Sequence, residues 1–375
     1  MAKNIVIFCD GTNNEIAGNQ TSVLRLFRML VCNGEQRLFY DAGVGTHADP
    51  TAQWPLQRLV QKRLDAAIGM SIRNHVLGAY SFLSNHYEEG DRIYLFGFSR
   101  GAYTVRALAG MLFRCGLLCA DYDNLSAYAW SVFSDEDRRG DRRQMFGGAA
   151  RIKKVFGREV PIHFVGVWDT VSTFGWLWDL LTVPNTDKNP IVHHFRQALS
   201  IDEKRPCFEP ILFNPQKGQS SIQVWFAGVH ADIGGGYPPE ASGLSRLPLE
   251  WMLNEAVQLD LIIDPVKVKK QLLEIGTASE RCEFSEQHDE SVRPMWRIQG
   301  WLPKHSFRTA ERRYMWHWPN WATRRTIPED SLVHQSVKTR MDNATLRYEP
   351  KLPTNYTLIR TVPCHSLSDL LLPLE

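Results

Sequence analysis

The chain has 375 residues, of which 43% are apolar, and its formal net charge at pH 7 is +2. This composition excludes a disordered chain and is typical of a soluble globular protein with a large core. The near-neutral balance gives no reason to expect nucleic acid as a partner. The first apolar run ends at Asp10, and no stretch approaches the ~18 apolar residues of a membrane span. We therefore expect the protein to be made in the cytoplasm, and any export would use no cleaved signal peptide.

The seven cysteines show no paired close spacing. Cys9, Cys115 and Cys207 lie within apolar or element-like stretches. This pattern predicts reduced, buried thiols rather than a disulfide framework.

The first strand is predicted over residues 4–9, NIVIFC, and a polar loop, Asp10-Gly11-Thr12, follows it. Loops at the carboxyl ends of parallel strands are where α/β sheets gather their sites. Asp-Gly-Thr also ends the DxDGT signature of haloacid-dehalogenase-like phosphatases. Their nucleophilic aspartate would fall at position 8, where this chain has Phe8, so we set that interpretation aside.

Helices are predicted over residues 22–30 and 66–85, and a second strand over residues 37–40. The glycine-rich loop at residues 41–46 lacks GxGxxG spacing, which argues against a dinucleotide site. The alternation of strands and helices indicates a mostly parallel sheet with helices on both faces, the α/β class.

The most informative stretch is DRIYLFGFSRGAYTVR, at residues 91–106. A β-rich apolar run leads into Gly97, Ser99 and Gly101 in GxSxG spacing, and a helical run begins at Ala102. A strand, a sharp turn that carries a serine, and a helix form the nucleophile elbow of α/β hydrolases. The small neighbours let strand and helix approach closely while the hydroxyl of Ser99 projects into a cleft.

An oxyanion hole is predicted beside Ser99 from two backbone N–H groups. One belongs to Arg100, at the start of the helix, and the other to the Gly11–Thr12 loop. The partial positive charge of the helix N-terminus would lie beneath the forming oxyanion. The alternative is a serine in an ordinary strand-to-helix turn.

Two further predicted strands end at residues that complete a catalytic triad. The strand over residues 160–167 stops shortly before Asp169, and the strand over residues 222–228 stops before His230 and a triple glycine. Ser99, Asp169 and His230 follow the nucleophile, acid, base order of α/β hydrolases. A serine hydroxyl is a weak nucleophile near neutral pH, so an imidazole must take its proton and a carboxylate must hold that imidazole in the right tautomer.

Two residues are alternatives for these roles. Asp232 can replace Asp169 as the acid, although at two residues from His230 it would more naturally hold the loop. His334 is the rival base, and its structural role would be a hydrogen bond that anchors the C-terminal segment. Asp169 can instead cap the following turn.

The combination of FCDGTNN, GFSRGAYTVRALAG, GVWDTV and WFAGVHADIGGGY resembles the α/β-hydrolase family that includes type VI secretion phospholipase effectors and their uncharacterised bacterial and fungal relatives. The resemblance covers residues 3 to about 240, and VHQSVKTR, at residues 333–340, is similar to a late motif of that family. It implies Ser99 as nucleophile, Asp169 as acid and His230 as base, with hydrolysis of phospholipid esters as the activity.

We expect residues 1–240 to form the catalytic core, with residues 121–159 as a charged cap insertion, and residues 241–375 to form an extension packed on it. Residues 247–261 are predicted to be helical. Another part of the extension is rich in tryptophan and arginine, residue types that prefer an anionic lipid interface, so it is a candidate for peripheral membrane contact. The alternative is that these tryptophans pack in the core. The residues are Trp296, Trp301, Trp316, Trp318 and Trp321, with Arg297, Arg308, Arg312, Arg313 and Arg324.

The sequence as a whole predicts a serine hydrolase of carboxylic esters, a phospholipase or lipase. The alternatives are an esterase or thioesterase of small substrates, and a non-catalytic interaction protein that retains the elbow. The expected partner is a lipid or small ester substrate, joined by a secretion-system or immunity protein if the chain is an effector. No cofactor is expected, and His193-His194 lacks the further ligands of a zinc site.

Overall fold

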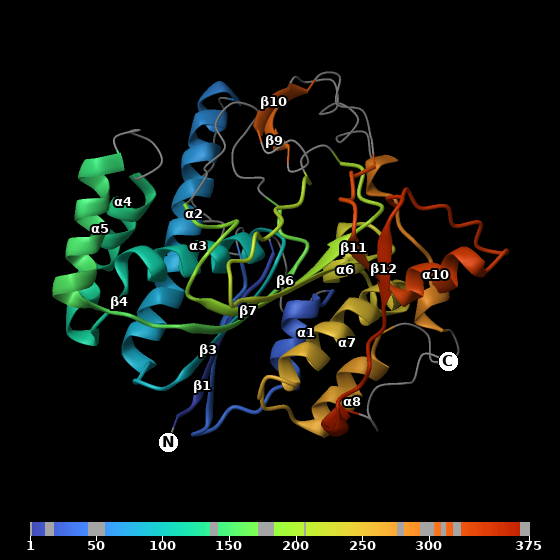
Figure 1. The fold of residues 1–375 in the computed structure, drawn as a ribbon, viewed down its shortest axis with the longest axis horizontal. Helices are drawn as coiled ribbons and strands as arrows, with labels where there is room; N and C mark the ends of the chain where they lie inside the picture. The colour runs from blue at the N-terminus through green and yellow to red at the C-terminus, as the bar shows by residue number, and fades with distance from the viewer. Residues whose placement is uncertain are drawn as a thin grey trace.

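The fold is built on one eight-stranded sheet, seen in a computed structural model (Figure 1). The residues that the structure describes are 2–11, 19–43, 57–135, 142–171, 184–205, 208–275, 281–292, 304–308, 313–317 and 324–367. The strand order is β12-β11-β8-β7-β6-β3-β1-β2, and every pair of neighbours is parallel. The predicted α/β-hydrolase-like class, a mostly parallel sheet with helices on both faces, is confirmed.

The strands of the main sheet are β1 (Asn4–Cys9), β2 (Gln36–Asp41), β3 (Arg92–Phe98), β6 (Ile162–Trp168), β7 (Val192–Ser200), β8 (Ser220–Phe226), β11 (Ser331–His334) and β12 (Tyr356–Ile359). Two small antiparallel pairs stand apart from it, β4 (Leu117–Leu118) with β5 (Gly157–Arg158) and β9 (Lys304–Arg308) with β10 (Arg313–His317).

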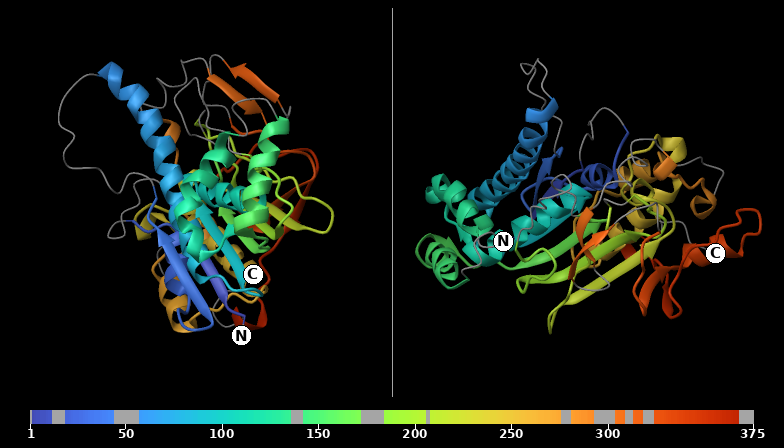
Figure 2. Two further views of the ribbon diagram at one scale, coloured as in Figure 1. Left: turned by 90° about the vertical axis from the view of Figure 1, so that its left-hand side faces the viewer. Right: turned by 90° about the horizontal axis from the view of Figure 1, so that it is seen from above.

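The helices cover both faces of the sheet, as Figures 1 and 2 show. On one face lie α2 (Gln57–His86), α3 (Arg100–Cys115), α4 (Ser126–Asp135) and α5 (Arg142–Phe156). On the other lie α1 (Ser22–Met29), α7 (Gly243–Val257) and α8 (Pro265–Leu273). Because both faces are covered, every residue of β1 is buried and the strand reads as a continuous apolar run.

The carboxyl ends of β1 and β3 lie at a topological switch point. The chain leaves β1 towards the edge strand β2 and then returns past β1 to form β3 on its other side. Neighbouring loops diverge to opposite faces at such a point, which leaves a crevice where ligands of open α/β sheets bind. Ser99 directly follows β3, and Asp10 directly follows β1, so the switch point places the predicted site loops together.

The strand β7 was not predicted, because its sequence, VHHFRQALS, is polar for a buried strand. Arg196 and Gln197 are nevertheless buried within it. The guanidinium of Arg196 forms an ion pair with Glu255 of α7 at 2.5 Å and donates to the backbone and hydroxyl oxygens of Ser220. These partners come from distant segments, so local sequence gives no sign that the charge can be buried.

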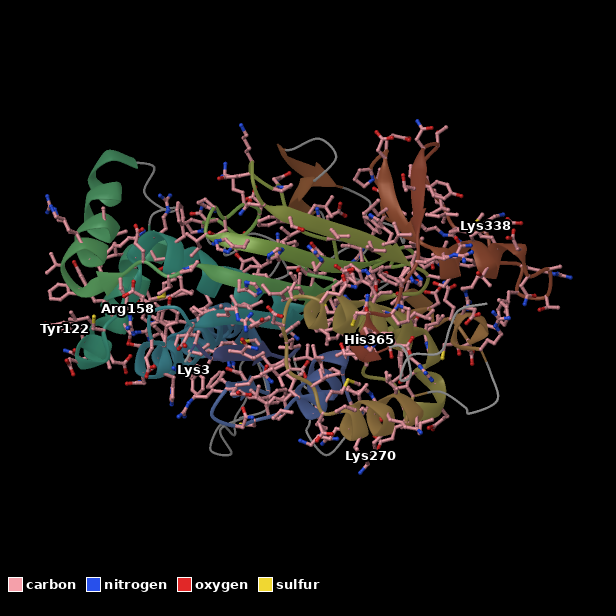
Figure 3. The ribbon with its side chains drawn as sticks, turned by 60° about the horizontal axis from the view of Figure 1, so that its bottom comes forward. Lys3, Tyr122, Arg158, Lys270, Lys338 and His365 are labelled. Atoms are coloured by element: carbon pink, nitrogen blue, oxygen red, sulfur yellow. The ribbon has the colours of Figure 1, made fainter. Side chains whose placement is uncertain are left out.

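Residues on both sides of position 240 contribute to the same sheet and core. The strands β11 and β12 extend the sheet beyond β8, and α10 (Gln335–Asp342) follows β11 directly. Residues 121–159 contain α4 and α5, which bury Trp130, Phe133 and Ile152 against α2 and α3. Tyr122, just before α4, and Lys338, on α10, mark opposite ends of the molecule (Figure 3). Among the described residues, no helix has the length and apolar character needed to cross a membrane.

The ion pair of the buried Arg196 and the half-buried Glu255 gives a first prediction, for stability. Arg196→Met leaves the Glu255 carboxylate without its partner and should lower the free energy of unfolding by about 3–5 kcal/mol. The double variant Arg196→Met/Glu255→Leu removes both charges. Its loss of unfolding free energy should be smaller than the sum of the losses in Arg196→Met and Glu255→Leu. Urea unfolding of the four proteins as a double-mutant cycle measures the coupling. Additive losses would show that the pair is not coupled in the fold.

Candidate active site

The turn between β3 and α3 holds Ser99 in a strained backbone conformation. Its φ is 57° and its ψ is −120°, a combination that non-glycine residues rarely adopt. The backbone N–H of Ser99 donates to the carbonyl of Trp168 at the end of the neighbouring strand β6, at 3.1 Å. This bond and the following helix fix the turn, so the serine has the backbone of a nucleophile elbow.

Close approach of α3 to β1 explains the second glycine of GxSxG. A Cβ atom on Gly101 would lie 2.0 Å from the carbonyl oxygen of Cys9, a distance that no real contact permits. The first turn of α3 therefore rests directly against the end of β1, beside the Asp10-Gly11 loop. The sequence predicted only that small residues let the helix approach the strand before it, and a Cβ atom on Gly97 would indeed lie 2.6 Å from the Gly101 carbonyl oxygen. The contact of Gly101 with β1 is known from the structure alone.

The loop after β1 is held by the carboxylate of Asp10. This buried group accepts hydrogen bonds from Thr21 Oγ1 at 2.5 Å, Tyr40 Oη at 2.8 Å and the Gly11 N–H at 2.6 Å. The Gly11 N–H is thus engaged by its own neighbour. Thr12, the other residue predicted for the oxyanion hole in this loop, lies outside the described residues.

Asp169 and His230 form a buried hydrogen-bonded pair. Asp169 Oδ2 lies 2.5 Å from His230 Nδ1, and the two side chains are 0% and 7% exposed. Asp169 follows β6 with a φ of 41°, and His230 begins the short helix α6 (His230–Gly234) after β8. The predicted acid and base therefore meet across 61 residues of sequence.

The other ring nitrogen of His230, Nε2, is buried and makes no hydrogen bond to any residue in the described ranges. Because a carboxylate only accepts, Nδ1 carries the proton in the neutral ring and Nε2 is left as a free acceptor. The rings of Phe98 and Phe208 lie 4.6 Å and 4.8 Å from the imidazole, centroid to centroid. A Cβ atom on Gly234 would lie 2.0 Å from the Phe98 ring, so the first of the three glycines makes room for that ring.

Burial and charge act in opposite directions on this pair. Burial lowers the pKa of His230 below its ordinary value, and the Asp169 hydrogen bond and charge offset only part of that effect. Burial alone would raise the pKa of Asp169, but the charge of Arg325 and the bond to His230 outweigh it and hold the pKa well below its usual range. The stable state near neutral pH is therefore an aspartate beside a neutral histidine.

Arg325 is a member of this cluster that the sequence did not reveal as a site residue. Its guanidinium binds Asp169 with two bonds, Nη1 to Oδ1 at 2.6 Å and Nη2 to Oδ2 at 2.9 Å. It directly follows the Trp/Arg-rich segment, and nothing in the neighbouring sequence sets it apart from the other arginines there. Only contact with a residue 156 positions earlier separates it from its exposed neighbour Arg324.

The two alternative site residues have other partners. Asp232 accepts from the backbone N–H of Val229 at 2.9 Å, within its own loop, and from His288 Nδ1 at 2.7 Å. His334 is fully buried at the start of α10, where its Nδ1 lies 2.8 Å from Ser336 Oγ and its Nε2 lies 3.2 Å from Thr361 Oγ1. Burial lowers the pKa of His334 to about 3. These contacts hold the His230 loop and the C-terminal segment in place.

Most of the Trp/Arg-rich segment lies outside the described residues. The described part comprises β9 and β10, which carry Arg308, Arg313 and Trp316, and the chain from Arg324 onward. The β9–β10 hairpin lies beyond the carboxyl edge of the main sheet, above it in Figure 1 and in the left view of Figure 2.

Within the described ranges, no group of three or more His, Cys, Asp or Glu side chains is placed to hold a metal ion.

An all-parallel sheet with a strained serine after β3 and a buried Asp–His pair at the same edge defines an α/β-hydrolase-like protein. The chain belongs to the family described as T6SS phospholipase effector, Tle1-like, catalytic domain, which it matches over residues 3–255. The predicted family resemblance is thus confirmed.

The chain is similar to several proteins of greater length. It is 38% identical over 226 residues to an uncharacterised protein of Saccharomyces cerevisiae, a match that covers 57% of this chain and 33% of that protein. An uncharacterised Pseudomonas aeruginosa protein of solved structure is 20% identical, with a TM-score of 0.40 and coverage of 76% of this chain and 49% of the other. The Tle1 effector bound to the VgrG spike of the type 6 secretion system is 19% identical, with a TM-score of 0.34 and coverage of 65% and 52%. The chain therefore spans about a third of the yeast protein and about half of each solved one.

The contact between α3 and β1 gives a second prediction. Gly101→Ala places a methyl group 2.0 Å from the Cys9 carbonyl oxygen, so the elbow must shift or the protein must unfold. We expect a loss of more than about 2 kcal/mol in the free energy of unfolding. Gly34→Ala is the matched control, because no atom lies within 4 Å of its added methyl group, and it should change stability by less than about 0.5 kcal/mol. Equal effects of the two substitutions in urea unfolding would contradict the described contact.

The buried imidazole of His334 gives a third prediction, for pH. Its folded pKa of about 3 lies below its ordinary value of 6.5, so the unfolded chain binds the proton more readily. The stability this provides is present above pH 6.5 and is lost as the pH falls towards 3. Between pH 7 and pH 5 the free energy of unfolding of the wild type should therefore fall by about 2 kcal/mol more than that of His334→Asn. Parallel curves of unfolding free energy against pH would show that His334 titrates in the same way in both states.

Proposed function

We propose that this chain is a serine hydrolase that cleaves carboxylic esters, with phospholipids as its substrate class. The observation that carries the proposal is the buried Asp169–His230 pair with a free Nε2 atom, at the same sheet edge as the strained Ser99. Membership of the Tle1-like phospholipase effector family supports the lipid as substrate.

In the proposed mechanism His230 Nε2 takes the proton of Ser99 Oγ as the oxygen attacks the ester carbonyl carbon. Asp169 holds the imidazole in the required tautomer and stabilises the imidazolium that forms. The imidazolium then gives its proton to the departing alcohol, which leaves an acyl group on Ser99. Water, activated by His230 in the same way, hydrolyses that acyl group and restores the serine.

The proposed oxyanion donors are backbone N–H groups on both sides of Ser99. The N–H of Arg100 opens α3, where the first N–H groups of a helix have no partner within the helix. The loop after β1 supplies the second donor, and the bond between Gly11 and Asp10 favours the Thr12 N–H for that role over the Gly11 N–H. Each such donor typically contributes a factor of about 10²–10³ in kcat.

The shifted pKa of His230 sets the expected pH dependence. The base must be neutral to accept the serine proton, and burial lowers its pKa below 6.5. The rate constant kcat/KM should therefore stay constant above pH 6.5 and fall only below it. This fall, the acid limb of the pH profile, reflects protonation of His230 alone.

The fourth prediction tests the nucleophile. A fluorophosphonate probe should label the wild-type protein at Ser99, and Ser99→Ala should abolish labelling and ester turnover without lowering Tm. His230→Ala should reduce kcat about as far, by a factor of roughly 10⁴–10⁶, because members of one triad act as a unit. Ser134→Ala, a change to a serine whose hydroxyl donates to the Ser131 carbonyl in the same helix, and His334→Asn are the controls and should keep turnover within a few-fold of wild type.

The substrate class is tested with a panel of phospholipids and short-chain esters, with products identified by mass spectrometry. Release of fatty acid from phospholipids supports the proposal as stated. Turnover of short-chain esters alone would support an esterase of small substrates. Wild-type protein that is neither labelled nor active on any ester would exclude a serine hydrolase and favour an interaction protein.

A further inference from the structure

Arg325 fills the remaining hydrogen-bonding capacity of the Asp169 carboxylate. Asp169 Oδ1 accepts from Arg325 Nη1 at 2.6 Å and from the Ser200 N–H at 3.1 Å. Asp169 Oδ2 accepts from His230 at 2.5 Å and from Arg325 Nη2 at 2.9 Å. A planar guanidinium bound to both oxygens fixes the plane of the carboxylate, which a single donor cannot do.

Arg325 is itself held from several sides. Its Nη1 donates to the carbonyl of Ser200 at 3.1 Å, its Nε donates to the carbonyl of Phe208 at 3.0 Å, and its Nη2 also donates to Phe208. The side chain is only 3% exposed. Phe208 in turn packs its ring against the His230 imidazole. The arginine therefore contacts the carboxylate and supports one of the two rings that enclose the base.

The charges around His230 come from three segments of chain. Asp169 follows β6, Glu203 and Arg205 follow β7, and Arg325 precedes β11. Glu203 accepts from the His230 N–H at 3.1 Å and pairs with Arg205 at 2.8 Å, and Glu209 adds a further negative charge near Arg325. The cations near the pair are thus Arg205 and Arg325, and the anions are Asp169 itself, Glu203 and Glu209.

We propose that Arg325 is a positioning residue of the active site, which orients the Asp169 carboxylate towards His230 and neutralises its charge. This inference rests on the proposed function, since it assigns Asp169 and His230 as acid and base. Loss of Arg325 removes a cation from beside the pair, so the pair takes up a proton more readily, whichever of the two residues holds it. The base is then blocked at a higher pH than in the wild type.

The same geometry makes the C-terminal segment part of the active site. The family match ends at residue 255, and Arg325 lies 70 positions beyond it. The chain that follows Arg325 is fixed by β11, which pairs with β8, and by the buried His334 at the start of α10. Residues 3–255 alone therefore contain the acid and the base but lack the cation that holds the acid in place.

The fifth prediction tests this role with Arg325→Met, Arg325→Lys and the matched control Arg324→Met in the full chain. A soluble short-chain ester is the substrate, so that lipid binding does not enter. Arg325→Met should lower kcat about 10²-fold with little change in KM, and should move the acid limb of kcat/KM up by about one pH unit. Arg325→Lys keeps a cation but cannot bridge both oxygens. Its acid limb should therefore lie within a few tenths of a pH unit of the wild type, and its kcat should lie between those of Arg325→Met and the wild type. Arg324→Met, at an exposed side chain that donates to the Glu349 carbonyl, should behave as wild type.

A direct readout separates this inference from the proposed function. The pKa of the His230 imidazole, followed by NMR of the ring nitrogens, should rise in Arg325→Met whether or not the protein hydrolyses esters. If Arg325→Met does not fold, the loss of kcat in Arg325→Lys at an unchanged Tm carries the test. An unchanged kcat and an unchanged limb in both Arg325 variants would overturn the positioning role. An unlabelled, inactive wild type that still shows the NMR shift would overturn the proposed function and leave the coupling of Arg325 to His230 standing.

Discussion

The carboxylate of Asp169 has no exposed surface, and the arrangement of the active-site edge depends on how its charge is balanced. A buried carboxylate without partners is so costly that it would take up a proton or unfold the chain around it. Here it accepts two bonds from Arg325, one from His230 and one from the backbone of Ser200. These donors come from the ends of β7 and β8 and from the segment before β11, so the charge ties the sheet together at its carboxyl edge.

The backbone at this edge is strained at two positions that are linked by a hydrogen bond. Ser99 and Asp169 both have positive φ values, 57° and 41°, although neither is glycine. The carbonyl of Trp168 accepts from the Ser99 N–H, so the two strained residues belong to one hydrogen-bonded unit across β3 and β6. Strain of this kind persists only where the surrounding packing determines the conformation, and such positions concentrate at functional sites. The close contact of Gly101 with Cys9 supplies that packing from the side of β1.

The matched family region and the C-terminal segment are interdependent in this fold. The matched region contains Ser99, Asp169 and His230, but β11 and β12 complete the sheet and Arg325 completes the hydrogen bonds of the Asp169 carboxylate. His334 illustrates the same dependence in a different way, because a fully buried neutral imidazole anchors the start of α10 through Ser336 and Thr361. The Asp169–His230 pair thus relies on hydrogen bonds from a segment that lies outside the matched family region.

Local sequence determined the strands that are apolar throughout, the elbow and the order of the triad candidates. The continuous apolar run NIVIFC predicts a buried strand, and GxSxG between a strand and a helix predicts small residues where the helix approaches the strand before it, as Gly97 does. The tertiary structure alone decided that a polar strand such as β7 is buried, because the partner of Arg196 is Glu255, 59 residues away. It also decided which of many arginines binds the Asp169 carboxylate. Two opposite charges stabilise each other only when they lie close together in space. The sequence around Arg325 does not indicate which carboxylate will lie beside it.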